Sequence, residues 1–125
     1  MSRLLVDTHA LLWWLTDNPA LPATARATIA DSSSELLVST ASLWEIAIKR
    51  SIGKLRVSED LPDKVAKRGF TWLPVRAEHV WAVRALPQHH RDPFDRLLVA
   101  QALTERMPVV TADARFAAYG VEVRW

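Results

Sequence analysis

The chain has 125 residues, a length that suits one domain with one core, so we expect residues 1–125 to fold as a single unit. Half of the residues are hydrophobic, 24% are charged and the net charge is +2, an ordinary balance that excludes a disordered or strongly basic chain. The lack of cysteine excludes disulfides and thiolate metal ligands. Asp7 and His9 interrupt the apolar start, and no apolar run approaches the roughly 20 residues that span a bilayer. We therefore expect a cytoplasmic protein without a signal peptide or membrane segment.

Strand and helix patterns alternate along the chain. In chain order, the expected elements are a strand at 3–6, helices at 8–16 and 22–31, a strand at 35–39, helices at 40–51 and 61–68, a strand at 71–75, helices at 77–86 and 92–106, a strand at 108–111, a helical turn at 113–118 and a strand at 121–124. Pro74 cannot donate to a ladder, which places its strand at an edge. The alternation predicts an α/β fold, a three-layer α/β/α domain with a mostly parallel sheet of four or five strands.

Four acidic residues stand at comparable places in these elements: Asp7, Glu45, Asp95 and Asp113. Three of them lie at or soon after the end of a strand, and ligands bind at that edge of open parallel sheets. Each acid alone could be a helix cap or, for Glu45, the partner of Lys49 one turn later. Four acids at one edge would repel one another, and Mg²⁺ or Mn²⁺ would remove that repulsion. Such a cation can activate a water for hydrolysis of a phosphodiester.

Four sequence blocks carry a resemblance to a known family. They run from Asp7 to Trp13, from Ser39 to Lys49, from Asp92 to Ala102 and from Thr111 to Asp113. In this order and at these spacings they resemble the motif blocks of the PIN-domain ribonucleases, and in particular the VapC-type toxins of type II toxin–antitoxin systems. The resemblance spans nearly the whole chain, although Ala112 stands where the family often has Asn.

The resemblance implies a metal-dependent endoribonuclease that acts as a toxin and hydrolyses RNA phosphodiester bonds with a metal-activated water. It implies that Asp7, Glu45, Asp95 and Asp113 hold the Mg²⁺ or Mn²⁺ and are the catalytic residues. It also implies a preference for single-stranded RNA, a cognate antitoxin protein whose C-terminal segment covers the site, and a homodimer.

Further residues near the blocks could support the acids or contact RNA: Thr8, Ser42, Lys49, Arg96 and Thr111. Lys49 and Arg96 could each steady a carboxylate or contact a phosphate, and Thr111 could orient a water or a carboxylate.

Other polar residues have structural interpretations. We expect Asp92 to cap the helix that follows it, with Pro93 in the first turn, rather than to bind metal. Ser42 and Glu45 could form a capping box if their helix begins late. His9 is expected to be hydrogen-bonded at a helix start. His89 and His90 could bind metal, but two adjacent histidines without a third partner are typical of a solvated loop.

The six tryptophans are many for this length. Some are expected at a dimer or antitoxin surface, and base stacking on the active face is possible. For Trp44 we expect core packing.

Alternative functions remain at this point. A receiver-like phosphoacceptor domain also gathers acids at strand ends, although a helical Glu45 fits it poorly. In an RNA- or protein-binding module the acids would be caps only. A housekeeping RNA-processing PIN nuclease would keep the chemistry without the toxin role. The sequence has none of the phosphate-loop, zinc-protease or serine-hydrolase motifs.

Overall fold

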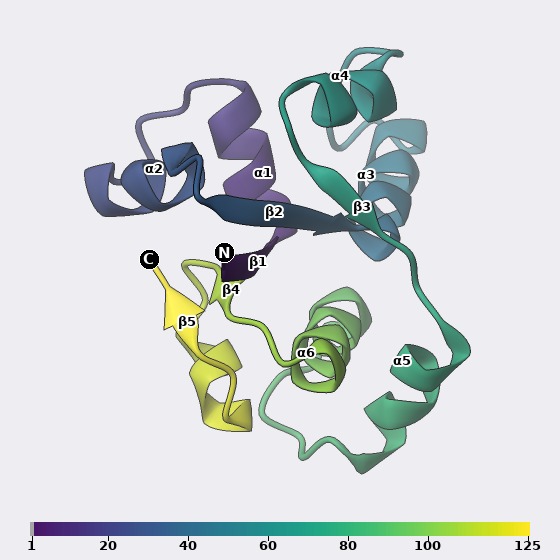
Figure 1. The fold of residues 1–125 in the computed structure, drawn as a ribbon. Coiled ribbons are helices and arrows are strands. Elements are labelled where there is room, and N and C mark those ends of the chain that lie inside the picture. Colours follow the sequence, from purple (N-terminus) through teal and green to yellow (C-terminus); the bar gives the residue numbers. More distant parts are fainter. Residues whose placement is uncertain (1) are drawn as a thin grey trace.

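A parallel β-sheet forms the middle layer of the protein, whose residues 2–125 are described by a computed structural model (Figure 1). The five strands are β1 (Ser2–Val6), β2 (Ser34–Ser39), β3 (Thr71–Leu73), β4 (Val109–Val110) and β5 (Val123–Arg124). They lie in the order β3-β2-β1-β4-β5, and every neighbouring pair is parallel. The predicted α/β class is confirmed, and the sheet expected to be mostly parallel with four or five strands has five strands, all parallel. β3 is an edge strand, as Pro74 indicated, and it ends just before that proline.

Helices cover both faces of the sheet. They are α1 (Thr8–Leu15), α2 (Ala23–Ala30), α3 (Thr40–Ser51), α4 (Leu61–Lys67), α5 (Ala77–Ala82) and α6 (Pro93–Glu105), with 3₁₀ turns η1 (Val83–Ala85) and η2 (Ala114–Tyr119). In Figure 1, α1 to α4 lie above the sheet and α5 and α6 lie below it. The helix predicted over 77–86 is therefore α5 followed by the tighter turn η1. In the described residues 2–125, no helix is both long and apolar enough to cross a membrane.

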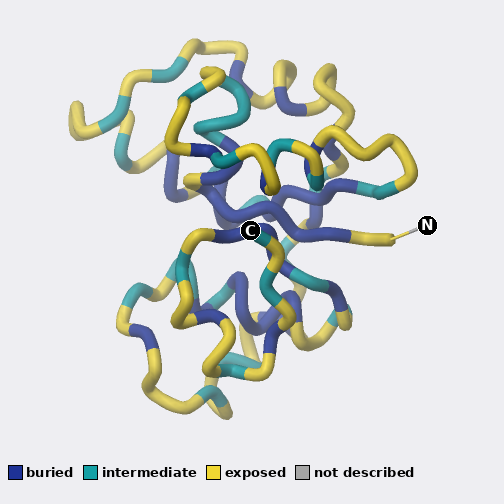
Figure 2. The backbone as a smooth tube through the Cα atoms, turned by 90° about the vertical axis from the view of Figure 1, so that its left-hand side faces the viewer, coloured by how far each residue is buried: buried dark blue, intermediate teal, exposed yellow. Residues whose placement is uncertain are grey.

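Alternating residues of the central strands feed two separate cores. In β1, Leu4 and Val6 join the core under α1, α2 and α4, whereas Leu5 joins the core under α6. Successive side chains of a strand point to opposite faces, so a central strand buried on both faces is apolar throughout. Figure 2 shows this buried middle layer running through the molecule.

The helices after β1 and β2 begin at the residue that ends the strand or follows it. Asp7 caps α1 by accepting from the N–H of Ala10, and Ser39 caps α3 by accepting from the N–H of Ala41. The capping box proposed for Ser42 and Glu45 is therefore wrong, because α3 begins three residues earlier than that pattern requires. These immediate strand-to-helix transitions hold the first turns of α1 and α3 at the carboxyl edge of the sheet.

Trp44 corrects another expectation. Its side chain is 59% exposed rather than packed in a core. The buried side of α3 is made by Ala41, Glu45 and Ile46, and Trp44 projects away from it to contact the edge of Phe94, with ring centroids 5.0 Å apart. The periodicity of α3 thus turns a polar glutamate inward and a large aromatic side chain outward.

Candidate active site

Asp7 is the most constrained of the four predicted acids. It is 6% exposed at the junction of β1 and α1. Its Oδ1 accepts from the N–H of Ala10 at 2.8 Å, and its Oδ2 accepts from the hydroxyl of Thr111. Burial raises the pKa of Asp7, and the hydrogen bonds from Thr111 and Ala10 act against that rise. One oxygen of the Asp7 carboxylate thus caps α1, and the other is hydrogen-bonded by Thr111, which follows β4.

Glu45 is buried in α3 and paired with a cation. It is 4% exposed, and its Oε2 accepts from Lys49 Nζ at 2.7 Å. That hydrogen bond, with the charges of Asp92 and Asp95, raises the pKa of the Lys49 ammonium. The pairing of Glu45 with Lys49 expected from their spacing is confirmed, and Lys49 lies within electrostatic reach of the acids at the start of α6.

Asp95 lies in the first turn of α6, where Asp92 is the cap. The Asp92 carboxylate accepts from the N–H groups of Phe94 and Asp95 at 2.8 and 3.1 Å, which confirms the predicted cap. Burial raises the pKa of Asp95 to about 6, and the charge of Asp92 adds to the rise. Glu45 and Asp7 act in the same direction. The charges of three other acids, Asp92, Glu45 and Asp7, therefore all act on the Asp95 carboxyl.

Asp113 follows β4 and has a cationic partner. Arg115 donates to both of its oxygens, from Nε to Oδ1 at 3.0 Å and from Nη2 to Oδ2 at 2.9 Å. Burial acts to raise the pKa of Asp113, but hydrogen bonds from Arg115 and His90 prevail and lower it to about 2. Thr111 Oγ1 accepts from the N–H of Asp113 at 3.0 Å, so Thr111 touches two of the acids.

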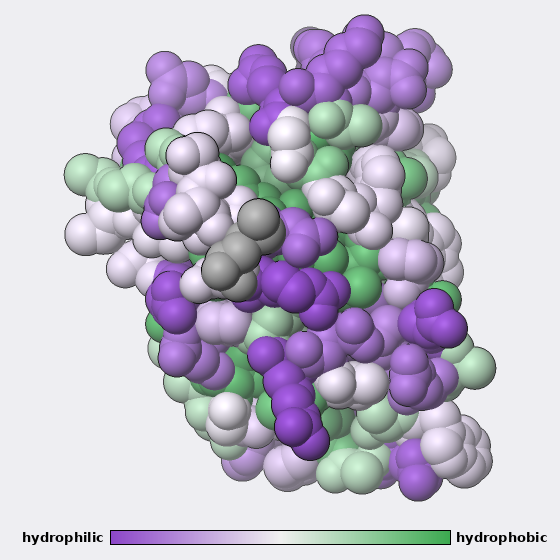
Figure 3. Space-filling model, in the orientation of Figure 1, coloured by the Kyte–Doolittle hydropathy of each residue, from purple (hydrophilic) through white to green (hydrophobic). Residues whose placement is uncertain are grey.

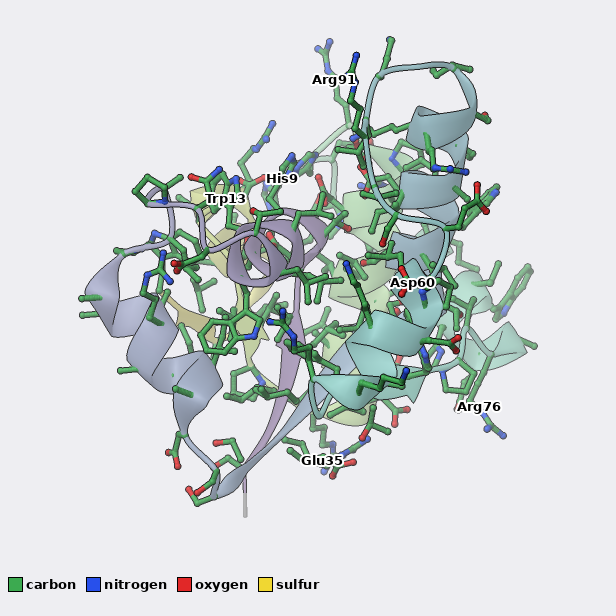
Figure 4. All side chains as sticks on the ribbon, turned by 90° about the horizontal axis from the view of Figure 1, so that it is seen from above. His9, Trp13, Glu35, Asp60, Arg76 and Arg91 are labelled. Atoms are coloured by element: carbon green, nitrogen blue, oxygen red, sulfur yellow. The ribbon has the colours of Figure 1, made fainter. Side chains whose placement is uncertain are left out.

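The acids meet at a cleft of about 570 Å³ at the carboxyl edge of the sheet. Asp7, Asp95 and Asp113 line it, with Arg91 and Arg115 among the other lining residues. Figure 4 shows His9 and Arg91 toward this end of the molecule and Glu35, near the start of β2, toward the opposite end. Glu45 is not a lining residue, but its charge reaches Asp95. The structure therefore brings three predicted acids to one cleft and the fourth behind them.

His90 was missed by sequence reasoning. It was expected in a solvated loop, but it is 4% exposed and its Nε2 lies 2.8 Å from Asp113 Oδ2 and 3.1 Å from Asp95 Oδ2. These three ligating atoms lie within 4.8 Å of one another. The partners that the sequence seemed to lack are Asp95 of α6 and Asp113 after β4. His89, its neighbour, is exposed as expected.

Arg96 does not face the cleft. It is buried under the loop before α6, and its guanidinium donates to carbonyl oxygens of that loop, the shortest being Nη1 to Pro87 O at 2.9 Å. It also donates to the hydroxyl of Tyr119 at 3.2 Å. Arg96 is thus not placed to contact a phosphate in this conformation, because it is buried and both of its terminal nitrogens already donate to neighbouring oxygens. Its contribution to the site is to shape the loop that carries His90.

The remaining predicted residues lie behind or beside the acids. Thr8 donates from Oγ1 to Ser42 Oγ at 2.8 Å, and both residues are buried. This bond joins the first turns of α1 and α3, which carry Asp7 and Glu45. His9 is exposed, and its ring centroid lies 6.0 Å from that of Trp13. His9 therefore lies beside the tilted ring of Trp13, and it lines the cleft.

A second group of ligating side chains lies at the other end of α6. It consists of Glu78, His79 and Glu105. His79 Nδ1 accepts from the N–H of Arg76 at 3.0 Å, and its Nε2 lies 3.1 Å from Glu105 Oε2. This arrangement ties α5 to the end of α6.

The donor set at the cleft fits a hard divalent cation. Carboxylate oxygens are the ligands that Mg²⁺ and Mn²⁺ prefer. Asp7 is buried and Asp95 is partly buried, and burial together with the charges of neighbouring acids raises the pKa of Asp95. A bound cation would reverse that effect, because positive charge favours the ionised carboxylate.

Comparison with known families identifies the fold. The family model of the PIN domain matches residues 4–122. The chain belongs to the PIN-domain family. Ribonuclease VapC22 of Mycobacterium tuberculosis is 30% identical to it, over 92% of this chain and 90% of that protein. The family expected from the four sequence blocks is confirmed.

Solved structures share the architecture of this PIN domain. A VapBC2 complex from Rickettsia felis with promoter DNA has a chain that superposes with a TM-score of 0.72 at 13% identity, covering 98% of this chain and 97% of that one. A DNA-bound VapBC from Salmonella typhimurium gives 0.71 at 16% identity, covering 99% and 98%. At such identities these likenesses establish the fold of the PIN domain.

Proposed function

We propose that this PIN domain, residues 1–125, is a Mg²⁺- or Mn²⁺-dependent endoribonuclease that acts as the toxin of a toxin–antitoxin pair. The observation that carries the proposal is the convergence of Asp7, Asp95 and Asp113, from three separate elements, on one cleft with Glu45 behind them. The relationship to a protein named as a VapC ribonuclease supports RNA as the substrate.

Asp7, Glu45, Asp95 and Asp113 would hold the cation. When bound there, the cation supplies activation of water and stabilisation of the negative charge that builds on the phosphate. No side chain in the set is needed as a nucleophile. The catalytic role of these four residues is thus to bind the cation and fix its position through their carboxylates.

Neighbouring residues of this chain fix those carboxylates. Thr111 donates to Asp7 and accepts from the N–H of Asp113, so it sets the orientation of one acid and the backbone of the other. Lys49 neutralises Glu45. Arg91 also lines the cleft, where it offers a guanidinium group to an RNA phosphate, whereas Arg115 is engaged by Asp113.

We further propose that the protein is cytoplasmic, binds a cognate antitoxin and forms a homodimer. A cognate antitoxin is supported by the structural neighbours, which are described as VapBC complexes. A homodimer is supported by an apolar groove between α3, α5 and α6, lined by Trp44, Val80 and Leu97 among others. Sedimentation velocity of the isolated chain should give the mass of two copies. A single-copy mass at micromolar concentration would remove the homodimer from the proposal.

RNA cleavage by the purified chain tests the function. We expect discrete fragments from single-stranded RNA with Mg²⁺ or Mn²⁺ and none with EDTA. Asp7→Asn should lower cleavage by at least 100-fold, roughly the loss of about 3 kcal/mol of transition-state stabilisation. Glu35→Gln is the matched control, because this partly exposed acid lies at the opposite end of the molecule (Figure 4).

Two outcomes would contradict the proposal. Cleavage that persists in Asp7→Asn would remove this acid from the mechanism. Metal-independent binding of RNA without cleavage, by protein shown to be free of antitoxin, would favour a binding module instead.

A further inference from the structure

The tautomer of His90 is fixed by its surroundings. The backbone N–H of Asp92 donates to His90 Nδ1 at 3.1 Å. An amide N–H can only donate, so Nδ1 carries its lone pair toward Asp92. The proton of the neutral ring is therefore on Nε2.

That proton lies between two predicted ligands from different elements. His90 Nε2 is 2.8 Å from Asp113 Oδ2 and 3.1 Å from Asp95 Oδ2. Asp95 belongs to α6, and Asp113 follows β4. His90 thus lies in the gap between the helix and the sheet edge, hydrogen-bonded to Asp113 and in contact with Asp95.

Contacts of both the ring and the backbone fix His90 in place. It packs edge-on against Phe116, with centroids 6.3 Å apart, and its backbone N–H donates to the Tyr119 hydroxyl at 2.8 Å. Its carbonyl oxygen accepts from Arg96 at 3.4 Å. A ring that is 4% exposed and fixed by these contacts has little freedom to turn, so it can impose its geometry on the acids.

We propose that His90 is a positioning residue of the candidate active site, which donates its Nε2 proton to Asp113, lies in charge-pair contact with Asp95, and thereby sets these two carboxylates to share a divalent cation. The inference rests on the proposed function for the identity of the cation site. His90 acts through the acids and does not itself bind the metal, because its lone pair is directed to Asp92. It is in this respect the outer partner that metal-binding carboxylates commonly have.

Mn²⁺ binding to the full chain, measured by the loss of the free-ion EPR signal, tests this inference. His90→Leu removes the donor and should weaken Mn²⁺ binding by roughly tenfold to hundredfold, the range that such outer partners contribute. His90→Gln keeps an N–H donor on a side chain of similar reach and should restore at least part of the affinity. Glu35→Gln is the control for Mn²⁺ binding, because this residue lies at the opposite end of the molecule from the cleft (Figure 4).

Two results would overturn the inference. One is Mn²⁺ affinity of His90→Leu equal to that of the wild type. The other is a ¹⁴N coupling from a directly coordinated ring in pulsed EPR of the wild-type Mn²⁺ complex, which would make His90 a ligand. The second measurement needs no variant, so it decides the matter even if His90→Leu does not fold.

Failure of the inference and failure of the function are distinguishable. Wild-type protein that cleaves RNA only with metal, together with an unaffected His90→Leu, refutes the role of His90 alone. Wild-type protein that binds Mn²⁺ but cleaves no RNA refutes the proposed function and leaves the positioning role to be judged from the binding data.

Discussion

At the scale of single residues, the candidate site is a set of carboxylates kept apart by donors. Thr111 holds Asp7, Lys49 holds Glu45, and Arg115 holds Asp113. Burial and acidic neighbours raise the pKa of Asp95 to about 6, although the nearby His90 acts to lower it. A bound cation should therefore favour the ionised form of Asp95.

The pH dependence of the free energy of unfolding should show the cost of ionising Asp95 in the folded protein. A carboxyl with a raised folded-state pKa stabilises the fold below its unfolded pKa, near 3.8, and loses that contribution as pH rises through about 6. Asp95→Asn cannot ionise, so in EDTA at pH 7.5 its free energy of unfolding should exceed that of the wild type. After a discount for partial exposure, we expect a gain on the order of 1 kcal/mol.

Urea unfolding at pH 4 and pH 7.5 in EDTA measures this difference. The gain should disappear at the lower pH, where Asp95 is protonated in the wild type. A wild-type protein that is as stable as Asp95→Asn at pH 7.5 without metal would show that the surroundings of Asp95 do not disfavour its ionised form.

At the scale of elements, the segment between η1 and α6 is organised by one buried guanidinium. Arg96 donates to the carbonyl oxygens of Val83, Leu86, Pro87 and His90 and to the Tyr119 hydroxyl. The donors are fixed in a planar fork, and a lysine cannot reproduce it. The loop that carries His90 is therefore tied to the first turn of α6, where Asp95 lies.

Arg96→Lys should loosen this loop. Leaving several buried carbonyl oxygens without donors is expected to cost about 2 kcal/mol of unfolding free energy. Hydrogen exchange should also speed up over residues 83–91. Arg56→Lys, at an exposed position, is the control and should change stability by less than about 0.5 kcal/mol. Unchanged exchange in Arg96→Lys would mean that the loop is held by other contacts.

The elements themselves were predictable from the sequence, and the loop was not. Apolar runs such as Leu4 to Val6 are local signals, and a strand buried on both faces needs nothing more to be recognised. The Asp92-Pro93 pair marks the start of α6 equally well. His90 has no local signal, because its burial depends on Phe116 and Tyr119, which lie more than 20 residues away along the chain.

The outward position of Trp44 also needed the tertiary structure. An amphipathic helix is normally oriented by its apolar side chains, but the side of α3 that faces the protein includes Glu45. The apolar character of a tryptophan, taken alone, favours its burial. The site overrides that preference, because Glu45 must reach the acids at the sheet edge.

At the scale of the whole molecule, the two ends of the sheet differ in character. Figure 3 shows the face on which β1 begins, with hydrophilic side chains gathered over α4 at its top. On this face Arg3 pairs with Glu35 and Glu105. The carboxyl ends of the strands instead hold the acidic cleft, with arginines at its wall. With a net charge of only +2, affinity for RNA must come from such local placement rather than from the overall charge.

The central claim is that the acids at the carboxyl edge of the sheet bind a divalent cation, and anomalous scattering from crystals soaked in Mn²⁺ tests it most directly. We predict an anomalous peak in the cleft, about 2.0 to 2.2 Å from carboxylate oxygens of Asp7, Asp95 or Asp113. Asp7→Asn crystals should show a weaker peak or none. A cleft without a peak, or Mn²⁺ bound instead at Glu78, His79 and Glu105, would contradict the account.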